Sequence, residues 1–237
     1  EEFGDYVKYW LTFNEIDSVG RHPFITAGII PDKCKDYSLD EAIYQALHHQ
    51  YIAAAKATKL CHQMIPDSKM GCMLTKLTTY PNTCHPSDVL LSLERNLDNY
   101  SHADIQIFGK YPILYLESLK KKNINIKMEK NDEKILLEGK SDYLAFSYYM
   151  SRTESADPNK EKAAGNTIMS VKNPYLESTE WGWQIDPVGL RISLVELYDR
   201  YNVPLIIVEN GMGALDNLED NNQIHDNYRI EYLKEHI

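Results

Sequence analysis

Two kinds of apolar pattern alternate along the chain: short runs of β-branched and aromatic residues, and longer stretches with apolar residues at helical spacing. The short runs predict strands, because such side chains fit a pleated sheet, at residues 7–14, 69–75, 142–149 and 204–209. The longer stretches predict helices at 39–65, 87–100, 104–108, 112–122, 187–201 and from about residue 226. A charged connector is expected up to residue 140, and the polar stretch 151–178 predicts a long surface loop.

Local residue patterns mark the start of two helices and the environment of one strand. Ser38 followed by Glu41 predicts a capping box at the start of the first long helix. Asp186 before Pro187 predicts an N-cap with proline at the first helical position. The strand at 204–209 is almost continuously apolar, which is typical of a strand covered on both faces.

The order of these elements predicts the fold class. Strands that alternate with helices favour an α/β protein of parallel β/α units with right-handed crossovers. With 237 residues, 43% of them apolar, the chain can form one large core, as in the (β/α)8 or TIM barrel. A complete barrel has eight strands, and the pattern predicts only half of them. We therefore expect residues 1–237 to be a single partial (β/α)8 barrel, the middle of a larger one, whose uncovered sheet edges favour a homo-oligomer.

The composition argues against several classes of function. With 25 Lys and Arg against 35 Asp and Glu, the net charge of −10 disfavours nucleic acid as a partner. No stretch approaches the roughly 20 apolar residues of a membrane span, and the first residues lack a signal-peptide pattern. We therefore expect no membrane partner and a cytoplasmic location. The four cysteines show no C-x-x-C spacing and predict reduced structural thiols.

The histidines do not indicate a metal site. His48 and His49 are adjacent, so on a helix their side chains diverge by about 100° and cannot share one face as ligands. We expect both to be packed or to lie on the helix surface. The histidines therefore predict no metal site, and the sequence implies no cofactor.

Two glutamates, Glu15 and Glu209, each end a predicted strand. In parallel barrels the active site gathers at the carboxyl ends of the strands. Two carboxyl groups about 5–5.5 Å apart carry out retaining glycoside hydrolysis, one as acid and the other as nucleophile. Taken singly, either glutamate is also explained as a solvated or N-capping residue.

The first glutamate ends the run Trp10-Leu11-Thr12-Phe13-Asn14-Glu15, and the second lies in the run Ile207-Val208-Glu209-Asn210-Gly211. The first run resembles the acid/base strand of glycoside hydrolase family 1 and the second its nucleophile strand, and the resemblance covers essentially the whole chain. Between them, in the family's order, come Ser147-Tyr148-Tyr149, Trp181-Gly182-Trp183, Asp186-Pro187-x-Gly189-Leu190-Arg191 and Asp199-Arg200-Tyr201. The resemblance implies about strands 4 to 7 of the TIM barrel.

The resemblance also implies roles for five residues. Glu15 would be the general acid and then the base, and Glu209 the nucleophile. Asn14 would donate to the sugar 2-hydroxyl, Tyr149 would orient Glu209, and Trp183 would be an aromatic platform for the leaving group. The alternatives are a turn residue for Asn14, strand packing for Tyr149 and a core tryptophan for Trp183; Trp181 we leave to packing.

Two departures from the common family pattern point to a substrate. Ile16 stands where most members have proline, and Ser147 where most have asparagine; both resemble the branch that cleaves 6-phospho-β-glucosides. The implied function is a retaining glycosidase for 6-phospho-β-D-glucosides, such as phosphorylated cellobiose or aryl glucosides. The alternatives are a β-glucosidase or β-galactosidase for unphosphorylated sugars, and an inactive structural fragment. The residues that hold the phosphate in that branch lie beyond Ile237.

Overall fold

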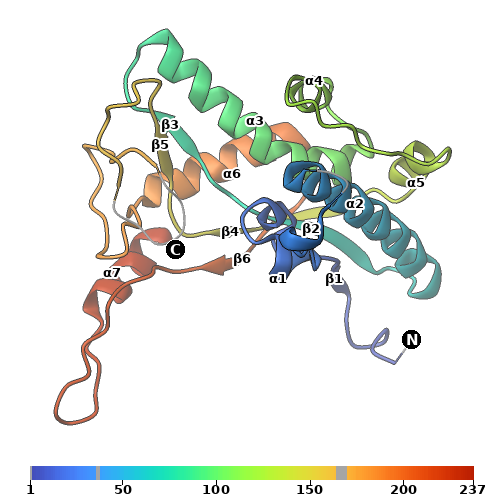
Figure 1. The fold of residues 1–237 in the computed structure, drawn as a ribbon. Coiled ribbons are helices and arrows are strands. Elements are labelled where there is room, and N and C mark those ends of the chain that lie inside the picture. The colour runs from blue at the N-terminus through green and yellow to red at the C-terminus, as the bar shows by residue number, and fades with distance from the viewer. Residues whose placement is uncertain (1, 36–37, 164–169) are drawn as a thin grey trace. The chain divides into compact units, whose positions relative to one another are not determined.

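The computed structural model describes residues 2–35, 38–163 and 170–237 (Figure 1). The chain divides into two compact units, which we call the first and the second unit. The first unit consists of Glu1–Thr75, Asp98–Phe146 and Tyr201–Ile206. The second unit consists of Lys76–Leu97, Ser147–Arg200 and Ile207–Ile237.

The predicted strands form one sheet in the order β1-β2-β4-β6. These strands are β1 (Tyr9–Leu11), β2 (Lys69–Thr75), β4 (Tyr143–Tyr148) and β6 (Leu205–Asn210). β1 and β2 are parallel, as predicted, with Tyr9 opposite Lys69 and Leu11 opposite Gly71. The side chains of β4 are all buried, and β2 exposes only Lys69, so the two inner strands form the covered part of the sheet.

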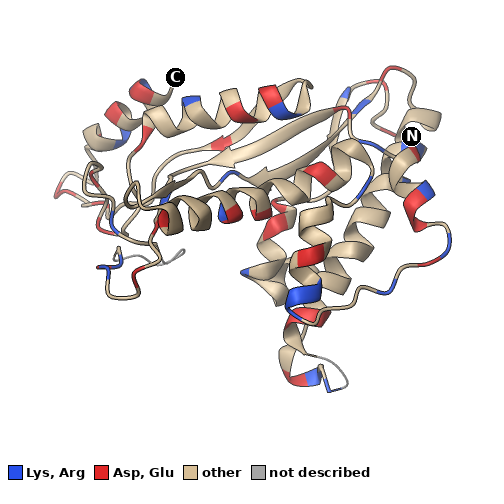
Figure 2. Cartoon of the chain, turned by 90° about the horizontal axis from the view of Figure 1, so that it is seen from above, with Lys and Arg blue, Asp and Glu red and all other residues tan. Residues whose placement is uncertain are grey.

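The helices follow the strands along the chain. The first unit contains the short turns η1 (Ile16–Gly20), α1 (Pro23–Ala27) and η2 (Pro31–Lys33), and the helices α2 (Leu39–Met64), α4 (Ile113–Lys121) and α5 (Asp132–Glu138). The second unit contains α6 (Pro187–Tyr201, of which Tyr201 belongs to the first unit) and α7 (Asn227–His236), and α3 (Pro86–Phe108) has residues in both. Acidic and basic residues are interspersed along these helices and the loops (Figure 2).

Both predicted helix starts are confirmed. Ser38 accepts from the Glu41 amide at 3.1 Å while the Glu41 carboxylate accepts from the Ser38 amide at 2.9 Å, which is a complete capping box. At the start of α6, Asp186 Oδ1 accepts from the Gly189 amide at 2.8 Å. These two contacts satisfy amides that would otherwise have no partner in the first helical turn.

The core of the first unit lies on one face of α2. Leu47 and Tyr51 of α2 pack in one cluster with Ile16 of η1 and Leu119 of α4. All four side chains are at most 2% exposed. Burying each large apolar side chain contributes about 1.5–3 kcal/mol, so this contact holds η1, and with it the segment that follows β1, against α2.

Three sequence predictions for the helices and loops are wrong in detail. The helices expected at 87–100 and 104–108 are one helix, α3, because its middle is buried: His102 is 9% exposed and bonds to the Tyr51 hydroxyl at 2.7 Å. The charged connector contains α5. The loop expected at 151–178 contains β5 (Arg152–Glu154), which pairs in parallel with β3 (Thr79–Pro81); residues 164–169 lie outside the described residues.

Two strand predictions also need correction, and both concern the outer strands of the sheet. The first strand ends at Leu11 rather than at Asn14, and Glu15 has a left-handed backbone with φ of 41°. In β6, Ile207 and Val208 are 38% and 40% exposed, so the expectation of a strand covered on both faces is wrong. β6 is the last strand in the sheet order, which accounts for this exposure.

Candidate active site

Glu209 lies near the end of β6, half-buried, in the second unit. The hydroxyl of Tyr149, the residue directly after β4, donates to Glu209 Oε2. Next to Glu209, the Asn210 side chain donates to the Tyr148 carbonyl at 2.8 Å. Two hydrogen bonds therefore join the ends of β4 and β6, one to the Glu209 carboxylate and one from its neighbour Asn210.

An aromatic group adjoins this pair. The rings of Tyr149 and Trp183 meet edge to face with centroids 5.4 Å apart, and Trp181 meets Trp183 in the same way at 6.2 Å. A Cβ at Gly213 would lie only 2.4 Å from the Trp181 ring, so only glycine lets the segment after β6 approach it. Tyr149 therefore contacts both Glu209 and Trp183.

Asp186 contacts Tyr148, the last residue of β4. Besides capping α6, its Oδ2 accepts from the Tyr80 hydroxyl at 2.8 Å, and its carbonyl accepts from the Tyr148 hydroxyl at 2.7 Å. Burial, together with this carboxylate, raises the pKa of the Tyr80 hydroxyl well above its usual value. Tyr80 consequently stays a neutral donor, and Asp186 holds α6 to both β3 and β4.

Glu15 and Asn14 belong to the first unit. Glu15 is half-buried at the start of η1, where its carbonyl accepts from the Ser18 amide at 2.7 Å, and Asn14 is exposed. The Glu15 carboxylate lies 3.8 Å from the Arg21 guanidinium. Glu15 therefore meets a charged partner, whereas the partner of Glu209 is a neutral hydroxyl.

Arg21 is a residue that the sequence reasoning missed. It donates to Asp17 Oδ2 and to Thr75 Oγ1, each at 2.7 Å, and Asp17 Oδ1 accepts from the Thr75 amide at 2.7 Å. This network fixes Arg21 between η1 and the end of β2. The available indication in the sequence was the i, i+4 pair of Asp17 and Arg21, directly after the predicted acid/base glutamate.

A buried lysine, Lys76, directly follows β2 in the sequence and belongs to the second unit. Lys76 has no exposed surface, and its ammonium lies 3.4 Å from Glu196 Oε2 on α6. Burial lowers the pKa of Lys76 to about 8, although Glu196 acts in the opposite direction.

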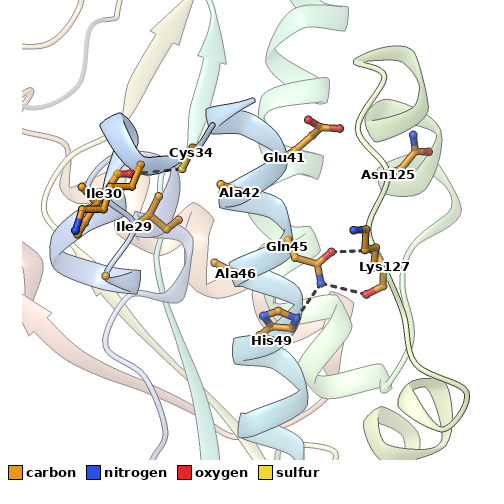
Figure 3. Close-up of a pocket in the computed structure, with 12 residues that line it drawn as sticks. Ile29, Ile30, Cys34, Glu41, Ala42, Gln45, Ala46, His49, Asn125 and Lys127 are labelled. Atoms are coloured by element: carbon orange, nitrogen blue, oxygen red, sulfur yellow. Dashed lines mark hydrogen bonds between the residues drawn. The ribbon is translucent and has the colours of Figure 1, made fainter. Parts of the chain in front are cut away.

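The first unit also contains a cavity of about 550 Å³ between the turn after α1, helix α2 and the segment around Lys127 (Figure 3). Gln45 spans part of it: its amide donates to the Lys127 carbonyl at 3.1 Å and accepts from the Lys127 amide at 2.8 Å. None of the five predicted site residues lines this cavity. The lining residues are Gly28, Ile29, Ile30, Lys33, Cys34, Glu41, Ala42, Gln45, Ala46, His49, Asn125 and Lys127.

The adjacent histidines have different surroundings. His48 is 1% exposed and bonds to the Tyr111 hydroxyl at 2.8 Å and to Asp132 at 2.9 Å, whereas His49 is exposed beside Gln45. The expectation that each of these histidines is either packed or on the helix surface is confirmed. Within the described part of the chain, no three His, Cys, Asp or Glu side chains come together as metal ligands. Among the described helices, none combines the length and apolar character that crossing a membrane requires.

Similar proteins of known structure identify the fold. A family 1 β-glucosidase from Thermotoga maritima superimposes with a TM-score of 0.79 at 27% identity, over 100% of this chain and 51% of that chain. The parallel β/α architecture is therefore that of a partial (β/α)8 barrel, which confirms the predicted fold class. That residues 1–237 form a single domain stays a prediction.

Sequence comparison identifies the family. The sequence model of glycosyl hydrolase family 1 matches residues 1–237, and the chain belongs to this family. It is 49% identical to the aryl-phospho-β-D-glucosidase BglH of Bacillus subtilis (strain 168), over 98% of this chain and 49% of that protein. It is 47% identical to a 6-phospho-β-glucosidase of Clostridium longisporum, over 99% of this chain and 50% of that protein. The chain thus spans about half the length of the curated relatives it matches.

Proposed function

We propose that the protein is a retaining glycosidase that hydrolyses 6-phospho-β-D-glucosides, such as phosphorylated cellobiose or aryl glucosides, in carbohydrate metabolism. The observation that carries the proposal is the hydrogen bond from the Tyr149 hydroxyl to the Glu209 carboxylate, at the end of a barrel strand. The relatives at 49% and 47% identity, both named for phosphoglucosides, support the substrate. Ile16 and Ser147 support the same substrate through their resemblance to that branch.

In the first step, the Glu209 carboxylate attacks the anomeric carbon and a glycosyl ester forms as the bond to the leaving oxygen breaks. A hydroxyl that donates to a carboxylate stabilises its negative charge, and Tyr149 supplies this contact. Glu15 gives its proton to the leaving oxygen. In the second step, water attacks the same carbon, Glu15 takes the proton from that water, and Glu209 is released as a carboxylate.

The other proposed site residues bind the sugar and the leaving group. Asn14 donates to the 2-hydroxyl, a contact that strengthens in the transition state. Trp183, which is half-buried against Tyr149, offers the face of its ring to the leaving group. We assign no metal and no cofactor to this chemistry.

The alternative substrate is an unphosphorylated β-glucoside, which the structural likeness to the Thermotoga maritima β-glucosidase supports. The deciding experiment compares hydrolysis of an aryl 6-phospho-β-D-glucoside and of the plain aryl β-D-glucoside by the 237-residue chain. We expect kcat/KM to be higher for the phosphorylated compound, which is the preference that Ile16 and Ser147 indicate. The resemblance places the residues that hold the phosphate beyond Ile237, so we attribute none of this preference to hydrogen bonds from those residues. Equal rates would favour the alternative, and no turnover of either would favour an inactive fragment.

We further propose a cytoplasmic location and a homo-oligomer. Four free thiols, of which Cys84 is exposed, suit a reducing compartment. Exposed apolar side chains on the outer strands, such as Tyr9 at 58% and Val208 at 40%, suit a contact between copies. Light scattering under reducing conditions measures the oligomeric state.

A further inference from the structure

Tyr232 on α7 is buried, at 2% exposed, and its hydroxyl contacts both strand ends that carry the nucleophile site. It donates to the Tyr149 carbonyl at 2.9 Å and accepts from the Asn210 side chain at 3.3 Å. Tyr149 is the residue that bonds to Glu209, and Asn210 directly follows Glu209. One phenol therefore bridges the backbone of the orienting tyrosine and the neighbour of the nucleophile.

The Asn210 side chain completes this link. Its amide nitrogen also donates to the Tyr148 carbonyl at 2.8 Å, so its two hydrogens serve two acceptors, one on β4 and one on α7. The carbonyls of Tyr148 and Tyr149 are thus both occupied, by Asn210 and Tyr232 respectively. Rotation of the peptide between them would break one of these bonds.

His236 holds the Tyr232 ring in place. The two rings are stacked, with centroids 3.8 Å apart and an interplanar angle of 21°. His236 Nδ1 bonds to the Tyr232 carbonyl at 2.7 Å, and since a carbonyl only accepts, Nδ1 carries the hydrogen. Burial raises the pKa of the Tyr232 hydroxyl well above its usual value, so it remains a donor across the neutral range.

We infer that Tyr232 is a positioning residue for the nucleophile: it fixes the Tyr149 backbone so that the Tyr149 hydroxyl stays on the Glu209 carboxylate. The inference rests on the proposed function, in which Glu209 attacks the sugar. Its action is indirect, through Tyr149 and Asn210. A displacement of about 1 Å in a reacting group costs about a hundredfold in rate, which sets the scale of the effect.

The test is Tyr232→Phe, which keeps the stacked ring and removes only the hydroxyl. The matched control is Tyr201→Phe, because Tyr201 is 5% exposed and donates to the Tyr100 carbonyl at 3.0 Å in the first unit. We expect kcat to fall about 10- to 100-fold in Tyr232→Phe with little change in KM. The control should stay within about threefold of the unmodified chain.

A double-mutant cycle separates positioning from general loss of structure. If Tyr232 acts through Tyr149, Tyr232→Phe should lower kcat much less in a Tyr149→Phe background than in the unmodified chain. Equal factors in both backgrounds would overturn the inference. If Tyr232→Phe does not fold, Asn210→Ala tests the same link from its other end. Asn210→Ala should likewise lower kcat much less in the Tyr149→Phe background than in the unmodified chain.

Crystal structures of the unmodified chain and the two single variants give a readout that does not need turnover. The bond between Tyr149 and Glu209 should be present in Tyr201→Phe and absent or displaced in Tyr232→Phe. A chain without any activity would count against the proposed function, and the structures would still decide the inference. A bond that survives Tyr232→Phe unchanged would overturn it.

Discussion

The surroundings of Glu15 and Glu209 differ although the sequence pattern around them is the same. Glu15 follows a short strand in a left-handed backbone, near an arginine that is fixed by Asp17 and Thr75. Glu209 lies in a regular strand, where its partner is the neutral hydroxyl of Tyr149. The Tyr149 ring in turn contacts the ring of Trp183. The comparison teaches that two carboxylates can each end an apolar run and still be held by opposite means, one by charge and one by neutral donors.

The largest expected effect concerns Glu209. In the proposed mechanism Glu209 bonds to the anomeric carbon, so we expect kcat of Glu209→Ala to fall at least about 10⁴-fold. Azide should restore part of the rate, because a small anion enters the space of the lost carboxylate and attacks in its place. Steady-state rates with and without azide measure both effects.

Glu231→Ala is the control for this variant, because Glu231 is an exposed glutamate on α7 that pairs with Lys234. Its rate should match that of the unmodified chain. Full activity of Glu209→Ala would end the assignment of the nucleophile.

A smaller and more selective effect is expected when Glu15 is changed. Glu15→Gln keeps the shape of the side chain but removes the proton that, in the proposed mechanism, goes to the leaving oxygen. For poor leaving groups we expect a fall of about 10²- to 10⁴-fold, and for excellent leaving groups little change in the first step. A series of aryl substrates with different leaving-group acidity measures this dependence. Equal losses across the series would contradict the role of Glu15 as general acid.

The smallest expected effect tests the charged support of Glu15. Arg21→Met leaves Asp17, whose side chain is 3% exposed, without its cationic partner. We expect the free energy of unfolding to fall by about 1–3 kcal/mol, measured by urea denaturation. Arg229→Met is the control: Arg229 pairs with Asp216 and Asp226, whose side chains are 40% and 35% exposed, so its loss should cost less than about 1 kcal/mol. An equal loss of unfolding free energy in the two variants would mean that the network around Glu15 stabilises the chain no more than these exposed ion pairs do.

Much of the fold could be predicted from the sequence where the cues are local. The capping box at Ser38 and the N-cap at Asp186 set the starts of α2 and α6, and β2 has the predicted bounds. The errors arise where distant residues decide. The middle of α3 is helical because His102 bonds to Tyr51, which is 51 positions away in the chain.

The candidate site divides in the same way. Glu209 could be placed from its position in a predicted strand, whereas Glu15 lies four residues after the end of β1. The roles proposed for Tyr149 and Trp183 come from the family resemblance. Arg21 and Tyr232 could not be predicted, because their partners Thr75 and Tyr149 are 54 and 83 positions away in the chain. Such pairings leave no periodic pattern in a single sequence.

The tryptophan pair beside Tyr149 has a spectroscopic consequence. The chain contains three tryptophans, and two of them, Trp181 and Trp183, lie in the aromatic group that adjoins Tyr149. Two of the three tryptophans therefore report on this region by their fluorescence. A ligand that stacks on Trp183 should alter that emission, so sugar binding can be titrated optically even in the inactive Glu209→Ala variant.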